Sequence, residues 1–336
     1  MRRIIVAAVA LLVVAAAASY TGYWFHLAGR LPEAIAAWAD ARRAEGSNVR
    51  WDSLAIGGFP ASLRVTLTGV AITGARPLPF QAAAAIVIGE ARPWNLRRWC
   101  VNAPQGARVE APSEGDTVAA AALDATMVIG TDNGATVALT AHQIAGSGAA
   151  AALRIADADA RLALPGRPPA DHRQDGPRVT LRLSGIVLPR AVPSLGATID
   201  ALTLSGAVKG AVPPGRLRQA LAAWRDDGGT IEFEEGALRW GSLAASANGT
   251  LALDAALQPI GALTATIDNH NAVIDAAVAG GTLRADDANL AKLLLGLMAK
   301  PGADGKKQLT LPVTLQDRRL FLGPVQIAVL PLFTWE

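Results

Sequence analysis

The stretch RVTLTGVAI, residues 64–72, decides the fold class. Polar and apolar side chains alternate along it, and in an extended chain every second side chain points to the same side. Val65 and Leu67 would then face a core, while Arg64 and Thr66 would face water. This alternation predicts a half-buried β-strand, because the apolar residues of a helix recur at every third or fourth position instead.

Runs of the same kind recur along most of the chain, separated by segments rich in Gly, Pro, Asp and Asn. Asp132-Asn133-Gly134 suits a tight hairpin turn, since Asn and Gly readily adopt a left-handed backbone. The pattern predicts a mainly β (α+β) protein built from elongated, curved antiparallel sheet(s) with covering helices. Further strands are predicted at residues 82–88, 107–111, 118–129, 136–141, 151–164, 178–188, 197–208, 230–233, 243–254, 263–267, 308–315 and 325–329.

Helical periodicity interrupts the strands three times. In the first helical segment Leu217, Leu221 and Trp224 lie on one side. Asp286 or Asp287 is expected to cap the third, and the last two are expected to form a helical hairpin laid against a sheet. Such helices cover an apolar face or an exposed edge. The three segments are residues 213–227, 269–279 and 286–300.

The N-terminal stretch IIVAAVALLVVAAAASYTGYWF, residues 4–25, carries no formal charge and is long enough to cross a bilayer. Its two ends differ in a way that sets its direction, because basic residues favour the cytoplasmic side and aromatic rings favour the membrane interface. The sequence therefore predicts one transmembrane helix in the inner membrane, with the N-terminus in the cytoplasm and the body in the periplasm. The residues expected to anchor and orient it are Arg2, Arg3, Tyr20, Tyr23 and Trp24.

A cleaved signal peptide is the alternative, because Ala16-Ala17-Ala18 is a small-residue cleavage site. We favour an uncleaved anchor, since the apolar run continues past that site into aromatic residues. The expected organisation is an anchor over residues 1–26, a juxtamembrane amphipathic helix over 27–46 and a periplasmic β-rich domain over 47–336. The Pro- and Gly-rich segment 165–177 is a candidate division of that domain into two halves.

The juxtamembrane helix is expected to begin near Pro32, because proline suits the first position of a helix. Ile35 and Trp38 share one face, and the helix is expected to stop at Gly46. Two interpretations of this face stay open. Trp38 rests on lipid headgroups in one, and the face packs on the domain in the other.

Composition and motifs leave little room for recognisable chemistry. The 336 residues include one cysteine and four histidines, so an internal disulfide and a cysteine-built metal site are excluded. No phosphate-binding loop, dinucleotide fingerprint, nucleophile elbow or zinc-protease motif occurs. We therefore expect no enzyme activity, no catalytic residue, no metal and no cofactor.

Charge is also weakly informative, because 31 Lys and Arg residues stand against 28 Asp and Glu residues. A nucleic-acid partner would need a concentrated basic face, so none is expected. The nearest approach to a basic cluster is diluted by Glu90 and Glu110, and a solvated face is its simplest interpretation. A surface for anionic lipid is the alternative. Its arginines are at positions 76, 92, 97, 98 and 108.

Three polar features outside known motifs have simple structural interpretations. Asp157 and Asp159 share a strand face and could hold a cation, but a solvated face is the simpler interpretation. The segment DNHN, residues 268–271, places His270 near a carboxylate, but its position before a helix favours N-capping over catalysis. Cys100 has arginine neighbours, and a buried, unreactive thiol is expected.

The chain resembles a known family at a turn followed by a strand that begins at Leu63. The turn, to which we assign a structural role, consists of Gly57, Gly58, Phe59 and Pro60. Together these residues are similar to a motif of domain-of-unknown-function family 2125, whose members are membrane-anchored, exported bacterial proteins. Residues 249–254 with 258–261, and 309–313 with 322–325, are similar to the strands before the family's helices and at its end. The resemblance covers most of residues 31–331.

Two positions depart from the family's pattern. Ala61 stands where the family tends to have an aromatic residue, and Asp317-Arg318 replaces a usual Asp-Gly turn. Both departures concern the geometry of a turn and leave the fold unaffected.

This family is similar in turn to the AsmA-like envelope proteins, which are anchored in the inner membrane and extend β-rich grooves implicated in phospholipid movement. The resemblance implies a protein that binds or passes membrane lipid in maintenance of the cell envelope. A sheet with one apolar face is compatible with this role, because it can shelter acyl chains from water. The alternatives are a non-catalytic scaffold for other envelope proteins, whose helices fill the apolar face, and an enzyme with a dispersed site.

Overall fold

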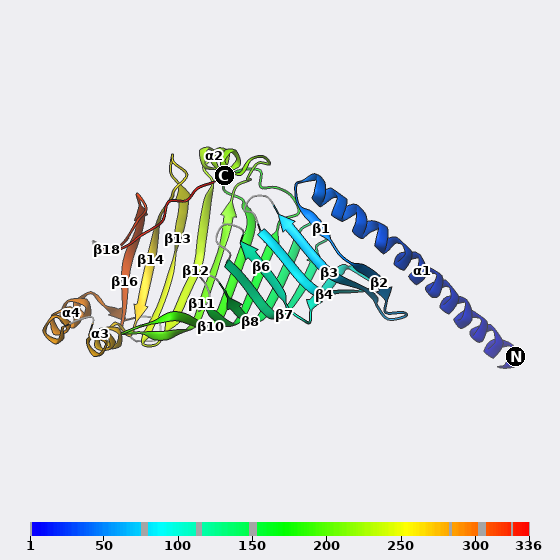
Figure 1. Ribbon diagram of the computed structural model, residues 1–336, viewed down its shortest axis with the longest axis horizontal. Helices are drawn as coiled ribbons and strands as arrows, with labels where there is room; N and C mark the ends of the chain where they lie inside the picture. The colour runs from blue at the N-terminus through cyan, green and yellow to red at the C-terminus, as the bar shows by residue number, and fades with distance from the viewer. Residues whose placement is uncertain are drawn as a thin grey trace.

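The computed structural model describes residues 2–74, 80–111, 116–147, 153–281, 284–301, 307–323 and 325–335. A long helix, α1 (Arg2–Ala44), precedes one antiparallel 18-stranded sheet (Figure 1). The predicted fold class is thereby confirmed. The strands are β1 (Asn48–Arg50), β2 (Ser53–Gly57), β3 (Leu63–Gly74), β4 (Phe80–Arg92), β5 (Asn95–Ala103), β6 (Ala107–Ala111), β7 (Asp116–Ile129), β8 (Ala135–Gly146), β9 (Arg154–Leu164), β10 (Asp175–Val192), β11 (Gly196–Lys209), β12 (Thr230–Trp240), β13 (Leu243–Leu253), β14 (Pro259–Asp268), β15 (Lys300–Pro301), β16 (Lys307–Gln316), β17 (Arg319–Leu322) and β18 (Val325–Val329).

The sheet is a meander in which strands adjacent in sequence pair along most of its width. From β7 to β14 each strand pairs with the next, and β14 then pairs with β16 across the inserted helices. The loop after β9 was the candidate division into halves. It joins two strands that pair from Arg154 opposite Val187 to Ala163 opposite Arg178, so the sheet continues through this segment without interruption.

Helix α1 corrects the expectation of two separate N-terminal helices, because it continues through Pro32. Proline lacks the N–H that a helix interior uses, and it usually ends or kinks the helix. Here Trp24 and Ala28 before the proline, and Ala39 after it, are all buried, so tertiary contacts hold both parts in one helix. The helix ends at Ala44, two residues before Gly46, where it was expected to stop.

The three short helices lie near the positions predicted for them, at the ends of the strands. Helix α2 (Leu217–Asp226) lies where β11 leads into β12. Helices α3 (His270–Ala279) and α4 (Ala285–Met298) pack together at the opposite end, beside β14 and β16 (Figure 1). They therefore border the sheet and leave most of its faces uncovered.

The expected helix caps are corrected. The residue at the N-cap of α3 is Asn269, but its side chain makes no capping hydrogen bond. The N-cap of α4 is Arg284, and Asp286 and Asp287 instead lie in the first turn, where carboxylates favour the helix dipole.

The fully buried hydrophobic core is small for a chain of this length. Trp24, Ala28 and Leu63 form one cluster of it where α1 crosses the start of the sheet, extended by partly buried neighbours. Other side chains, such as Trp224 and Leu309, are buried further along the chain. Strand β5, which contributes to this end, was absent from the prediction because the adjacent Arg97 and Arg98 break the alternation of polar and apolar residues.

Candidate functional site

A continuous row of apolar residues crosses the sheet from strand to strand. In each pair of neighbouring strands one member of this apolar row lies directly opposite the next, so all of the side chains project from the same face. The row contains only Ile, Val, Leu, Ala and Gly. Its members are Ile56, Val65, Gly89, Val101, Ala125, Leu139, Ala160, Leu181, Leu204, Gly236, Ala247, Ala265 and Leu311.

Residues immediately before or after these in sequence form a polar row on the other face. Only Ile88 and Ala237 within it lack a polar side chain, so the two faces differ along the whole width of the sheet. This contrast is what alternation within each strand predicts. The polar row consists of Thr66, Ile88, Asn102, Asp124, Thr140, Asp159, Arg182, Thr203, Ala237, Ser246, Thr266 and Thr310.

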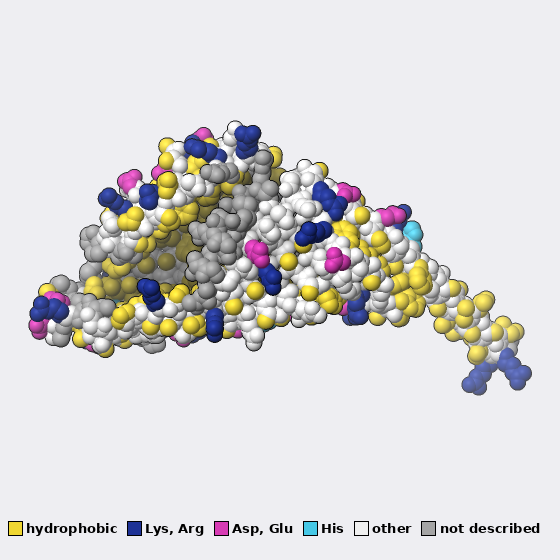
Figure 2. All heavy atoms as spheres, in the orientation of Figure 1, with side chains coloured by type: hydrophobic (Ala, Val, Ile, Leu, Met, Phe, Trp, Pro, Cys, Tyr) yellow, Lys and Arg dark blue, Asp and Glu magenta, His cyan; other side chains and the backbone are white. Residues whose placement is uncertain are grey.

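The apolar row is only partly shielded from solvent. Val65, next to α1, is 6% exposed, but Leu139, Leu181, Leu204 and Leu311 are all half-buried. A sheet face packed under another layer of a domain would bury such side chains fully. Figure 2 shows the result as a hollow lined by hydrophobic side chains on the side of the molecule that carries β12 to β14. This apolar groove is the candidate site.

At its other end the sheet is attached to α1 through two turns, which we call the foot of the sheet: residues 58–62, between β2 and β3, and residues 93–94, between β4 and β5. The Tyr20 hydroxyl donates a hydrogen bond to the carbonyl of Pro60. The Tyr23 hydroxyl donates one to the carbonyl of Pro93 at 3.0 Å. Both turns are therefore fixed to the part of α1 that follows its most apolar stretch.

Trp24 joins the two groups of residues that the sequence singled out. Its indole Nε1 donates to the carbonyl of Ser62 at 2.9 Å, and its ring meets that of Phe59 edge to face, with centroids 5.3 Å apart. The turn motif and the aromatic end of the predicted span thus form one contact. Sequence reasoning missed this contact because the partners lie far apart in the chain and neither segment contains a sign of the other.

Gly58 shows why the turn motif contains glycine. Its φ is +95°, a conformation that costs a residue with a Cβ free energy. An added Cβ would also lie 2.7 Å from the carbonyl oxygen of Ser62, the residue whose N–H donates to the carbonyl of Gly58. Gly57 has neither constraint. Of the remaining predicted anchoring residues, Arg2 and Arg3 lie at the free end of α1, far from the sheet (Figure 2).

The two carboxylates of β9, Asp157 and Asp159, contact side chains of the neighbouring strands. Asp157 contacts Nδ1 of His142 at 2.7 Å and accepts from the Ser184 hydroxyl at 3.2 Å, and these bonds hold the pKa of Asp157 below its ordinary value. Asp159 accepts from Thr140 at 2.9 Å. Because Ser184 contacts the carboxylate and not the imidazole, these side chains lack the nucleophile-to-base contact of a hydrolase triad.

The other polar candidates also lie apart from one another. Cys100 is exposed on the polar face, which corrects the expected buried thiol. His270 is buried, and no hydrogen bond joins it to Asp268 in the described structure. Among the described residues, no group of three or more His, Cys, Asp or Glu side chains is placed to hold a metal ion.

Comparison with known proteins gives one match. The model of a family described as "Uncharacterized protein conserved in bacteria (DUF2125)" matches residues 24–331, from Trp24 of α1 through the last strand. No curated protein and no solved structure matches the chain.

Proposed function

This chain belongs to the uncharacterised bacterial family DUF2125, and on that premise we propose that it is a membrane-anchored protein that binds lipid acyl chains along its apolar groove. The observation that carries the proposal is the apolar row, which is continuous from β2 to β16 and only half-buried over most of that width. A half-buried row of leucines needs another apolar surface to remove it from water.

The dimensions suit hydrocarbon chains. Neighbouring strands lie about 4.8 Å apart, so the row from β3 to β16 extends over roughly 50 Å. One leaflet contributes about half of a hydrocarbon core roughly 30 Å thick, so the groove is long enough for several acyl chains placed end to end. Ala125 and Ala160 present only methyl groups between the larger side chains of the row and so leave space for them.

The energetics favour passage as well as binding. Each methylene that leaves water contributes about 0.8 kcal/mol, so a chain of a dozen methylenes is held against release into water by roughly 10 kcal/mol. Transfer between a bilayer and the groove, in contrast, exchanges one apolar surrounding for another, and so it is nearly neutral. A groove fixed to a membrane helix can therefore exchange lipid with the bilayer. The proposal assigns no chemical step to any residue.

Anchoring rests on α1, which is the one described helix long and apolar enough to cross a membrane, with none of its most apolar window buried. Placing Arg2 and Arg3 in the cytoplasm puts the sheet in the periplasm, on the outer side of the inner membrane. Cys100 tests this orientation because it is exposed and is the chain's only cysteine. A membrane-impermeant maleimide should label it in intact spheroplasts to the same extent as in lysed ones. Labelling only after lysis would place the sheet in the cytoplasm and overturn the orientation.

Lipid binding is tested by photo-crosslinking the full chain in its native membrane. A benzophenone amino acid replaces Leu181, in the centre of the apolar row, and mass spectrometry reads the adducts. The matched control carries the same group at Thr180, the preceding residue on the opposite face of β10. We expect phospholipid adducts at position 181 and few at 180, because only residue 181 faces the groove.

The adducts also separate the alternatives. Equal lipid adducts at 180 and 181 would mean non-specific contact with the bilayer. Protein adducts at 181 without lipid would support an envelope scaffold instead. Either result would overturn lipid binding in the groove.

A further inference from the structure

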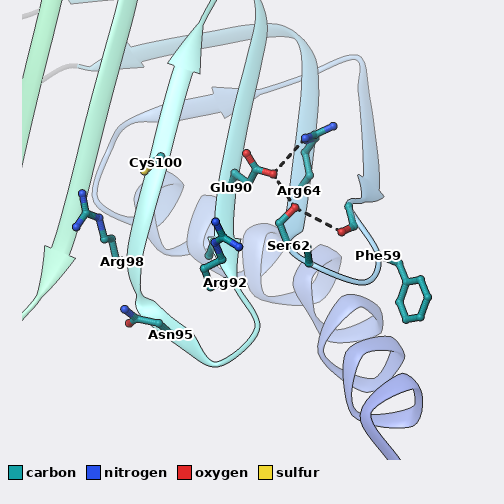
Figure 3. A pocket seen from close by; sticks show the side chains of 11 residues that line it. Phe59, Ser62, Arg64, Glu90, Arg92, Asn95, Arg98 and Cys100 are labelled. Carbon is teal, nitrogen blue, oxygen red and sulfur yellow. Dashed lines mark hydrogen bonds and ion pairs between the residues drawn. The ribbon is translucent and has the colours of Figure 1, made fainter. Parts of the chain in front are cut away.

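A second site lies on the opposite, polar face of the sheet, directly above the foot. A cavity of about 720 Å³ lies over the ends of β3, β4 and β5 (Figure 3). Its wall contains three arginines and a single carboxylate, so it is electropositive. The residues that define it chemically are Ser62, Arg64, Glu90, Arg92, Asn95 and Arg98.

The one carboxylate is already paired. The Ser62 hydroxyl donates to Glu90 at 2.6 Å, and Arg64 donates to the same carboxylate at 3.1 Å. The bond from Ser62, followed by the hydrogen bond and charge of Arg64, holds the pKa of Glu90 below its ordinary value. Glu90 is therefore ionised at neutral pH and balances Arg64.

The other two arginines keep their charge available. Neither Arg92 nor Arg98 forms an ion pair with any carboxylate that the structure describes. The Arg92 guanidinium lies over the ring of Trp94, 5.6 Å from its centroid, which orients it without neutralising it. Asn95 adds a neutral side chain beside them. This set of donors suits a phosphate group.

The position of this cavity along α1 favours the headgroup of a membrane lipid as the source of such a phosphate group. Tyr20 and Tyr23 bond to the two turns of the foot, so these turns lie where an apolar span from residue 4 to residue 25 leaves the hydrocarbon. Large apolar side chains are exposed at this level on three separate segments. These side chains are Phe25 (59% exposed), Phe59 (48%) and Trp94 (65%).

We propose that the foot of the sheet is a second membrane contact, which binds the phosphate headgroups of anionic phospholipids in the leaflet from which α1 emerges. Phe59 and Trp94 enter the interface, where aromatic rings are favoured, and Arg92 and Arg98 contact the phosphates above them. The proposal rests on α1 as a membrane span, but not on lipid in the groove, which lies on the other face.

The test uses the full chain in nanodiscs, with Cys100→Ser as background and one nitroxide at Ala61→Cys, an exposed position in the foot that leaves Phe59 and Trp94 intact. Val329→Cys, which is 61% exposed on the edge strand β18, is the control label. Oxygen concentrates in the membrane, whereas a nickel chelate stays in water. In discs that are one third phosphatidylglycerol, the nitroxide at position 61 should therefore collide more often with oxygen than with the chelate, and the nitroxide at position 329 should not. Leu96→Cys, at the start of β5 and two residues beyond the foot, supplies a second label in case A61C does not fold.

The role of the arginines is tested with R92Q/R98Q against R161Q/R182Q, a pair of exposed arginines on the same face but further along the sheet. Each basic residue near an anionic surface is expected to raise the ratio of docked to undocked protein about fivefold to sixfold. Losing two of them should therefore lower this ratio about thirtyfold. The control pair should leave the ratio unchanged. Discs of phosphatidylcholine alone should lower it in the wild-type chain.

Three outcomes would overturn the proposal. The first is a nitroxide that collides more with the nickel chelate than with oxygen at both positions 61 and 96 in anionic discs. The second is an equal effect of the two arginine pairs, and the third is release of the foot by inorganic phosphate. The last would mean a site for a free anion and not a lipid surface.

Discussion

The strand ends beside the foot and the centre of the sheet follow the same alternating pattern, but their apolar side chains are buried to different extents. Next to the foot, Leu63 of β3 is fully buried beneath Trp24 of α1. In the centre, Leu181 and Leu204 occupy equivalent positions on the same face and remain half-buried. The described short helices lie at the strand ends and do not supply a second layer there. Packing against α1 therefore closes the apolar face at this end of the sheet, whereas the central leucines, which α1 does not cover, stay half-buried.

The largest effect is expected when leucine is replaced by alanine at each of these two places in turn. Leu63→Ala should lower the free energy of unfolding by about 2–5 kcal/mol, because it removes buried methylene groups and leaves a cavity. Leu181→Ala should cost less than about 1.5 kcal/mol, since much of that side chain is already outside a packed core. Urea unfolding of the purified full chain, followed by intrinsic fluorescence, measures both.

Equal losses of unfolding free energy for the two leucine variants would contradict this difference in burial. They would mean that the centre of the sheet is a closed core in solution, which leaves no groove for acyl chains. A smaller loss of unfolding free energy for Leu181→Ala, together with fewer lipid adducts at the neighbouring groove positions, would show that Leu181 serves lipid binding more than the stability of the sheet.

The alternation of polar and apolar residues predicted the sheet well, because successive residues of a strand point to its two opposite faces. Val65 and Leu67 face the apolar side, and Arg64 and Thr66 face the polar side, as alternation requires. Asn133 adopts the predicted left-handed conformation in its hairpin turn, with φ of 65°. These features depend on neighbours within a few residues, which a single sequence contains.

Contacts between segments far apart in the chain could not be predicted from local sequence pattern. Pro32 resembles the first residue of a new helix, and only the burial of α1 on both sides of it explains why the helix continues. The cavity above the foot joins Arg64, Arg92 and Arg98 from three strands, although sequence spacing had grouped Arg92 and Arg98 with positions 76 and 108. Strand register decides which arginines share a face, and register is a property of the folded sheet.

A smaller effect is expected at the turn before β3, where two adjacent glycines have different roles. Gly58→Ala should lower the free energy of unfolding by about 1–3 kcal/mol, because it combines a φ of +95° with a close approach to the Ser62 carbonyl. Gly57→Ala should stay within about 0.5 kcal/mol of the wild type, since no atom lies within 4 Å of its added Cβ and its φ is ordinary. The same urea titration compares them.

Because Gly58 shapes the turn that places Phe59 on α1, its variant should also reduce membrane contact at the foot while leaving photo-adducts at position 181 intact. Loss of both would show that the foot and the centre depend on each other, and equal stability of the two glycine variants would remove the conformational reason for the motif.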